Sequence, residues 1–220
     1  CKLELGDIYL FSDNPWEATL LYSQVDKSFK NEPLGHEAKF RNAKLSFYIG
    51  EFTWAQAQLD VLKAATSKLI ANDAMELSLL IGDNLEEDSL AIPLKMYARA
   101  DLLEFRNHNA EALAVLDSLT TAYPAHIITA NALFKKAEIE IRNGKFRQAA
   151  DYYTEIIDKY PYGLMADDAM FNLAALLENQ LNDKMKAMEL YEKILTQYPG
   201  SLYVVDARKH FRALRKDPVN

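Results

Sequence analysis

The sequence has little cysteine, glycine and proline, and each shortage excludes a class of protein. It holds one cysteine, Cys1, among 220 residues, which excludes an intramolecular disulfide and a cysteine metal cluster. Seven glycines and seven prolines are too few for the many turns of an all-β fold of this length. The abundance of Ala, Leu, Glu and Lys favours helices instead.

Positive charge is also in deficit, because 25 Lys and Arg stand against 32 Asp and Glu, for a net charge of −7. This balance argues against a general nucleic-acid binder, which needs a basic surface to displace counterions. It argues in the same way against adsorption to anionic lipid. Protein partners remain, with a mild preference for basic ones.

Long apolar runs are missing as well. No stretch approaches the roughly 18 apolar residues of a membrane span, so we expect no direct membrane insertion. The first residues of the sequence lack the basic region followed by an apolar run that is typical of a secretory leader. Cys1 in first position suggests lipoprotein acylation, but CKLELGDIYLF continues at once into a helical pattern rather than a polar tether. This favours a chain boundary within a larger repeat protein.

Residues 130–161 set the pattern for the rest of the chain. Apolar residues at helical spacing predict two helices, broken at Asn143-Gly144 and closed by Pro161. The pattern has a small residue, a turn former about seven later, an alanine about five after that, and a large residue four further on. These are Ala137, Gly144, Ala149 and Tyr153.

The same four positions recur, and we predict five repeats over residues 2–32, 36–66, 93–124, 126–161 and 164–199. The other four repeats hold Gly6, Asp13, Ala18 and Tyr22; Ala43, Gly50, Ala55 and Leu59; Ala100, Asn107, Ala112 and Leu116; and Ala174, Asn182, Ala187 and Tyr191. The last repeat carries one extra residue before its turn. The second-helix alanines are 37 or 38 residues apart, except for one interval of 57.

The longer interval leaves room for one inserted helix. We predict it over residues 72–84, with Asn72 or Asp73 as its cap and an acidic turn over 83–89. After the last repeat, residues 201–215 predict one more amphipathic helix with Ser201 as its cap. A final helix with a polar outer face keeps an open-ended array soluble.

These residues resemble the tetratricopeptide repeat (TPR), which has a small residue in its first helix, an Ala-x-x-x-aromatic step in its second and a closing proline. The resemblance covers residues 2–215 apart from the insertion at 67–92. It lacks the usual Trp of the first helix, and Lys30 and Ser67 replace the closing proline in the first two repeats. It implies an all-α, right-handed superhelical solenoid of about twelve helices, forming a single domain over residues 1–220.

The sequences KYPYG and QYPGS, which follow second helices, resemble those of bacterial cell-envelope TPR proteins. Examples are the accessory lipoproteins of outer-membrane assembly and the periplasmic partner of the Tol–Pal system. This resemblance implies a periplasmic or outer-membrane-associated scaffold in a Gram-negative bacterium. A cytoplasmic location stays open.

No catalytic or metal-binding pattern stands out, and we expect no enzyme activity, no metal and no cofactor. The histidines lack a His or Cys at the i+3 or i+4 distance of a metal-binding helix, and we interpret them as surface or helix-end residues: His36, His108, His126 and His210. The acidic run Glu86, Glu87 and Asp88 lacks the spacing and the glycine of a calcium loop.

The resemblance implies a partner-binding groove, because the first helices of a TPR array line its concave face and bind peptide or helix ligands. Carried onto this sequence, the groove residues are Phe40, Lys44, Phe47 and Tyr48; Tyr97, Asp101 and Phe105; Asn131, Phe134, Glu138, Ile141 and Arg142; and Phe171 and Glu178. The aromatic members suit a second interpretation equally, in which they pack against the neighbouring repeat. The carboxylate-clamp form of the groove is not matched, since its asparagine positions hold Asp7, Lys44, Asp101, Glu138 and Ala175.

The predicted function is therefore a non-catalytic scaffold that binds a protein partner's peptide or helix by apolar burial and charge. One alternative is a structural or self-association module of a larger envelope protein, and the oligomeric state is open. The other is a hydrolase on an α-solenoid, which needs a carboxylate pair in a closed cleft. Its candidate acids are Asp101, Glu104 and Glu138.

Overall fold

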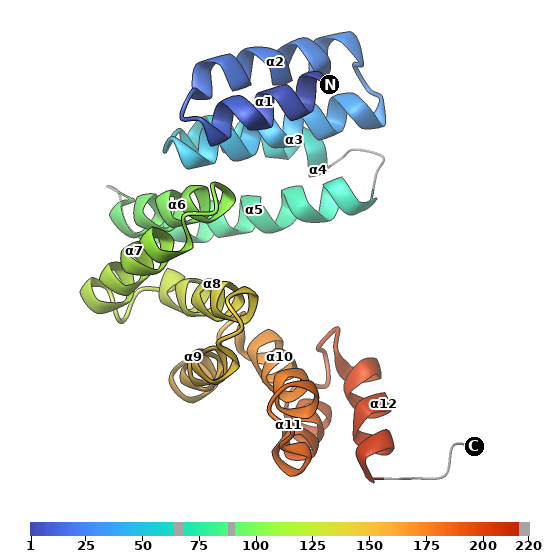
Figure 1. Cartoon of the computed structure of the whole chain (residues 1–220). Helices are drawn as coiled ribbons and strands as arrows, with labels where there is room; N and C mark the ends of the chain where they lie inside the picture. Colours follow the sequence, from blue (N-terminus) through green and yellow to red (C-terminus); the bar gives the residue numbers. More distant parts are fainter. Residues whose placement is uncertain (64–67, 88–90, 216–220) are drawn as a thin grey trace. The chain divides into compact units, whose positions relative to one another are not determined.

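The computed structural model describes residues 1–63, 68–87 and 91–215, and its regular elements over these residues are all α-helices (Figure 1). The helices are α1 (Lys2–Phe11), α2 (Pro15–Ser28), α3 (Pro33–Tyr48), α4 (Phe52–Lys63), α5 (Lys68–Glu87), α6 (Ile92–Phe105), α7 (Asn109–Ala122), α8 (Ile128–Arg142), α9 (Phe146–Lys159), α10 (Ala166–Asn179), α11 (Lys184–Gln197) and α12 (Val204–Arg215). The predicted all-α fold of about twelve helices, most of them paired, is confirmed.

Contacts divide the chain into two compact units, which we call unit 1 (residues 1–128) and unit 2 (residues 129–220). Unit 1 contains α1 to α7, and unit 2 contains α8 to α12 apart from Ile128, the first residue of α8. Within unit 1, α1 packs on α2, α2 on α3, α3 on α4, and α6 on α7. Within unit 2, α9 packs on α10, α10 on α11, and α11 on α12. The continuity of one array over residues 1–220 stays a prediction.

Each helix pair turns at the residue that the repeat pattern assigns to the turn. These residues all have positive φ, between 55° and 82°: Asp13, Gly50, Asn107, Gly144 and Asn182. The left-handed conformation ends the first helix, and the residue that follows donates its N–H back into that helix, as Lys145 does to Glu140 O at 2.8 Å. In the last repeat Asp183 donates to Leu177 O, so the extra residue is absorbed by a wider turn.

The alanines and large residues of the pattern form the core of each pair. The five second-helix alanines have no exposed surface, and the large residues four positions later are at most 1% exposed: Tyr22, Leu59, Leu116, Tyr153 and Tyr191. Alanine lets the two helices approach closely, and the large residue fills the space beside it. The repeat pattern therefore describes packing, and the residues that carry it are not available to a ligand.

The inserted helix is longer at both ends than the sequence analysis predicts. α5 covers Lys68–Glu87 rather than 72–84, so Asn72 lies inside the helix and the acidic turn predicted over 83–89 is wrong up to Glu87. A buried stripe begins at Ile70, before the predicted start, and continues through Ala74, Ser78 and Ile81 to Asn84 at the predicted end. Asp88 of the acidic run lies outside the described residues.

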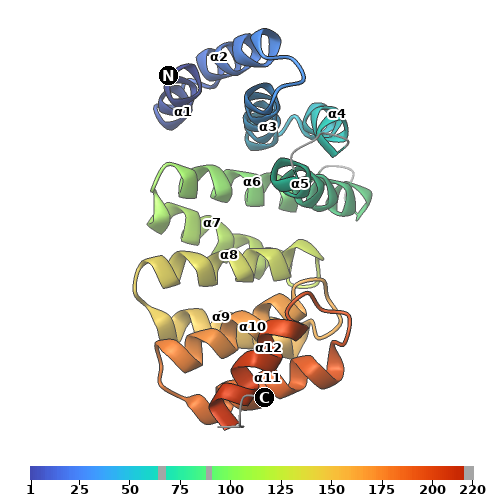
Figure 2. The same cartoon turned by 90° about the vertical axis from the view of Figure 1, so that its right-hand side faces the viewer.

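α5 packs along α4, where the Gln56 amide donates to Ser78 Oγ at 2.8 Å. It also touches α3 and α6, and α3 contacts α6 directly. Figure 2 shows α5 beside α6. The insertion therefore leaves the first helices of the second and third repeats in contact.

The C-terminal helix begins later than predicted, at Val204 rather than at residue 201. Residues 198–203 instead repeat the turn that follows α9. In both turns, a backbone N–H three residues after a tyrosine donates to its carbonyl, from Gly163 to Tyr160 and from Ser201 to Tyr198. The hydroxyl of Ser201 accepts from Tyr203 N at 3.1 Å, so Ser201 stabilises this turn.

Candidate partner-binding face

The structure separates the predicted groove residues by burial. Phe47 is fully buried and lies 5.7 Å from Phe52, while Tyr48 and Tyr97 are 7% and 8% exposed. These three are core residues, as the packing interpretation expects. Phe105 and Arg142 are exposed, and the remaining members are half-buried: Phe40, Lys44, Asp101, Asn131, Phe134, Glu138, Ile141, Phe171 and Glu178.

Four of the predicted residues come together in unit 1 between α3 and α6. The Lys44 ammonium lies 4.0 Å from an Asp101 carboxylate oxygen and 5.7 Å from the centre of the Tyr48 ring. The Tyr48 and Phe105 rings are 6.2 Å apart. We call Lys44, Tyr48, Asp101 and Phe105 the α3–α6 cluster. Phe105 is 37% exposed, so its ring is the apolar surface that the cluster presents to solvent.

Two carboxylates of α6 lie beside Tyr48 of the cluster. Burial raises the pKa of the Tyr48 phenol well above its ordinary value, and the carboxylates of Asp101 and Glu104 raise it further. Tyr48 therefore stays neutral. A cationic group that approached this place would meet the carboxylates of Asp101 and Glu104 and the exposed ring of Phe105, beside the Lys44 ammonium.

A second set of charges joins α1 to α3. Arg41 contacts Asp7 at 2.6 Å and Glu37 at 2.8 Å, and the Tyr22 hydroxyl donates to the other Asp7 oxygen at 2.7 Å. Asp7, Lys44 and Asp101 hold one position of the repeat pattern, so successive first helices of unit 1 are bridged at the same level. Lys44 and Asp101 are among the groove residues predicted from the sequence, whereas Arg41 is not.

A third link ties the end of α6 to the end of α1. The Arg106 guanidinium donates to Leu10 O at 3.0 Å and to Asp13 at 2.8 Å. Arg106 directly follows the last residue of α6, where no repeat position marks it. A charged residue next to a helix end is too common a pattern to single it out from the sequence.

In unit 2 the predicted residues of the last repeat are covered by α12. The Tyr203 ring stacks on Phe171 with ring centres 4.4 Å apart, and its hydroxyl donates to Asp168 at 2.7 Å. His210 Nδ1 lies 2.8 Å from Glu178 Oε2, and its ring stacks on Tyr191 at 5.1 Å. Phe171 and Glu178 thus hold α12 in place. His210 is half-buried in this contact, so its interpretation as a plain surface residue is wrong.

The fourth repeat keeps a more accessible first helix. Phe134 packs edge-on against Tyr153 of its own pair at 5.2 Å. Glu138, Ile141 and Asn131 are half-buried beside it, and Arg142 is exposed. Of the candidate hydrolase acids, Asp101 and Glu104 lie together on α6 of unit 1, whereas Glu138 lies on α8 of unit 2.

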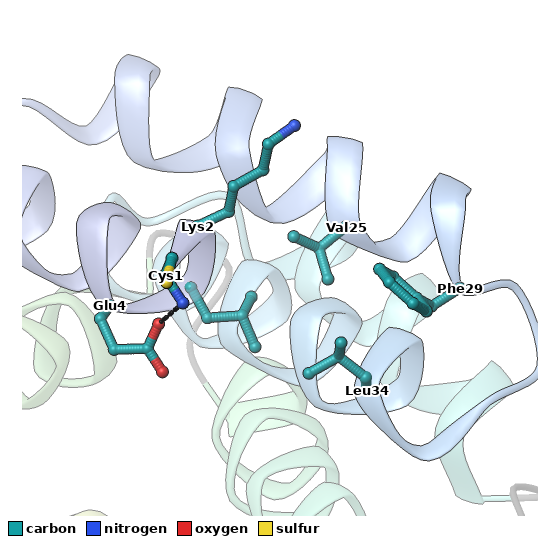
Figure 3. Close-up of a pocket in the computed structure, with 7 residues that line it drawn as sticks. Cys1, Lys2, Glu4, Val25, Phe29 and Leu34 are labelled. Carbon is teal, nitrogen blue, oxygen red and sulfur yellow. Dashed lines mark ion pairs between the residues drawn. The ribbon is translucent and has the colours of Figure 1, made fainter.

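A hollow of about 230 Å³ lies in unit 1, and it is lined by Val25 of α2, Phe29 directly after α2 and Leu34 of α3 together with residues 1–4 (Figure 3). It is smaller than the roughly 300–1,000 Å³ of small-molecule sites. Its only charged side chains are Lys2 and Glu4. Within the described ranges, no three His, Cys, Asp or Glu side chains are close enough to hold a metal ion.

Comparison with known proteins gives a family match and several structural matches. Residues 134–201 match the family model of the tetratricopeptide repeat. A crystal structure of a tetratricopeptide repeat protein from Parabacteroides merdae is similar over 98% of this chain and 72% of that chain, with 12% sequence identity and a TM-score of 0.45. No curated protein matches. No described helix is both long and apolar enough to cross a membrane.

Proposed function

We propose that this chain, which carries tetratricopeptide repeats, binds a segment of a protein partner on the first helices of unit 1 and catalyses no reaction. Such repeats generally mediate protein–protein interaction. The α3–α6 cluster is the observation that carries the proposal. It combines charged groups on two adjacent first helices with the aromatic ring of Phe105, which is 37% exposed.

The chemistry of unit 1 supports a basic and apolar partner segment. Unit 1 carries 19 Asp and Glu against 11 Lys and Arg. Two basic side chains of its first helices are already engaged, Arg41 with Asp7 and Glu37, and Lys44 with Asp101, while Lys95 and Arg99 of α6 are exposed. A cationic side chain of the partner would meet the remaining negative potential, and an apolar side chain would pack on Phe105.

Site-specific photo-crosslinking tests the proposal. A photoreactive amino acid at Phe105 should capture one protein from the native host, whereas the same group at Trp54 should not. Trp54 is the matched control because it is apolar and 60% exposed but lies on the second helix α4. The captured segment, made as a peptide, should bind the purified chain.

Substitution then locates the site. Phe105→Ala should lower the affinity for the peptide by about tenfold or more, since an aromatic anchor that becomes buried in a complex contributes more than about 1 kcal/mol. Trp54→Ala should leave the affinity unchanged. Equal capture at Phe105 and Trp54 would show that the partner does not bind at the α3–α6 cluster. An affinity unchanged by Phe105→Ala would show the same.

We place this function in the periplasm of a Gram-negative bacterium, on the resemblance of the KYPYG and QYPGS turns to those of cell-envelope repeat proteins. Fractionation of the native host, with an antibody to the protein, tests the location. Recovery with cytoplasmic markers contradicts it and leaves the binding proposal intact.

A further inference from the structure

Two turns of unit 2 expose apolar side chains at equivalent positions. Leu164 follows α9 and Leu202 follows α11, each three residues after a proline, and they are 73% and 94% exposed. Tyr162 in the first of these turns is 99% exposed, and Val205 at the start of α12 is 74% exposed. Core packing does not explain four apolar side chains that are each at least 73% exposed, three of them in two short turns and one at the start of α12.

The two turns lie side by side. The Tyr198 hydroxyl at the start of the second turn donates to Pro161 O in the first at 2.7 Å. Each turn also has the same internal backbone hydrogen bond, from Gly163 N–H to Tyr160 O in the first and from Ser201 N–H to Tyr198 O in the second. Their apolar tips therefore gather along one margin of unit 2. We call Tyr162, Leu164, Leu202 and Val205 the turn edge.

A basic stripe continues from the turn edge along α12. Arg208, Lys209 and Arg212 follow Val205 at i+3, i+4 and i+7, which places all four on one side of the helix. All four are exposed, while Ala207 and Phe211 on the other side pack into the core of unit 2. We call Arg208, Lys209 and Arg212 the basic stripe.

Acidic residues of α10 and α12 lie near these residues, among them Glu178, which contacts His210 of α12 at 2.8 Å. Asp206 is the one acid in α12, and Asp167 lies in the first turn of α10. Asp168 beside it accepts a hydrogen bond from Tyr203. Unit 2 as a whole carries 14 Lys and Arg against 13 Asp and Glu, so it lacks the acidic excess of unit 1. The net charge of the chain therefore says little about this margin.

We propose that the turn edge and the basic stripe dock unit 2 on an anionic lipid surface. Tyrosine and leucine tips insert into the interface between headgroups and acyl chains, where an amphipathic ring is favoured, and the basic stripe lies beside the headgroups. Protruding tips on turns suit a soft surface that closes around them, whereas a protein partner needs a matching hollow for each tip. The chain rests on the membrane and does not cross it. This docking is independent of the partner proposed for unit 1.

Sedimentation with vesicles tests the docking. The full chain should bind vesicles of equal parts phosphatidylglycerol and phosphatidylcholine, and should not bind pure phosphatidylcholine. Leu202→Ser should lower the partition coefficient about tenfold, because one leucine side chain loses its burial. Arg208→Gln with Arg212→Gln should lower it about 25-fold at low salt, since each basic residue near such a surface contributes about fivefold.

Matched controls lie at the other end of α11. Met185→Ser removes an apolar side chain that is 66% exposed, and Lys186→Gln removes an exposed charge that is 71% exposed. Neither should change the partition coefficient more than about twofold. Circular dichroism of every variant checks that the helices persist.

Three outcomes would overturn the docking. One is a failure of the full chain to bind vesicles that contain phosphatidylglycerol. Another is binding that survives both the Leu202 and the arginine substitutions. The third is an equal loss in the Met185 and Lys186 controls, which would mean nonspecific adsorption. Binding of an acidic protein at the same residues, without vesicle binding, would assign the margin to that protein instead.

Discussion

The two units join successive first helices by different chemistry. In unit 1 the links include ion pairs, between Arg41 and Asp7 and between Lys44 and Asp101. In unit 2 the link from α10 to α12 is a stack of Phe171 and Tyr203, with a hydrogen bond to Asp168. Charged links leave solvated groups on the face that they join, whereas the aromatic stack covers the positions beneath it. The first helices of the repeats can therefore carry a binding surface in one place and form an interface in another.

The largest loss of stability that we predict comes from removing a tyrosine that fills the core between the two helices of a pair. Tyr22→Ala and Tyr191→Ala should each lower the free energy of unfolding by about 3–5 kcal/mol, because each leaves a cavity in a closed core. Both tryptophans, Trp16 and Trp54, lie in unit 1, so their fluorescence reports unit 1 while circular dichroism reports both units. Urea unfolding should show the fluorescence transition shifted by Tyr22→Ala alone. Identical shifts in both signals for either variant would show that the units unfold as one.

The next effect concerns a close backbone approach in unit 1. A Cβ at Gly35 would overlap the carbonyl oxygen of Phe29, whereas a Cβ at Gly200 in unit 2 would meet nothing within 4 Å. Gly35→Ala should therefore cost about 1–3 kcal/mol in thermal or urea unfolding. Gly200→Ala is the matched control and should stay within about 0.5 kcal/mol of the wild type. A neutral Gly35→Ala would mean that the α2–α3 turn adapts.

A smaller effect separates the ionic link from the aromatic one. Arg41→Met should lower the stability of unit 1 by about 1 kcal/mol or less, because the pair with Asp7 is partly exposed. The loss should shrink in concentrated salt, which screens the charges of the wild type. Tyr203→Phe should cost unit 2 about 1 kcal/mol with little dependence on salt. Urea titrations at two salt concentrations measure both, and equal salt dependence would remove the distinction.

The smallest effect is a pH dependence confined to unit 2. Burial raises the pKa of Asp168 above its ordinary value, and the hydrogen bond from Tyr203 opposes the rise. The folded state then holds this proton more tightly than the unfolded chain, so Asp168 contributes stability at acidic pH. That contribution disappears as the pH rises through the raised pKa.

Asp168→Asn should remove this dependence. The stability of the wild type relative to the variant should fall between strongly acidic and neutral pH, as measured by urea unfolding followed by circular dichroism. Asp167→Asn, in the same turn of α10, should reduce the dependence without abolishing it, because the Asp167 charge also raises the pKa of Asp168. A relative stability that rises with pH would contradict the assigned cause.

The repeat positions were readable from the sequence because each depends on a local requirement. Asn107 and Asp13 occupy left-handed turns, and Ala112 lies where two helices approach, so residue type alone marks them. The start of α5 was not readable, because Ile70 extends the helix only through burial against neighbours. The α3–α6 cluster was anticipated as a list of residues, but which of them stay exposed was not.

The sequence by itself determined the helix pairs, their turns and the alanine and tyrosine core, since these follow from spacing and side-chain size over about 37 residues. Only the tertiary structure decided which first helices remain open. Phe105 and Phe171 come from comparable stretches of sequence, yet α12 covers Phe171 with Tyr203 and His210, while Phe105 keeps 37% of its surface exposed. Exposure depends on neighbours that are distant in sequence, and local periodicity carries no record of them.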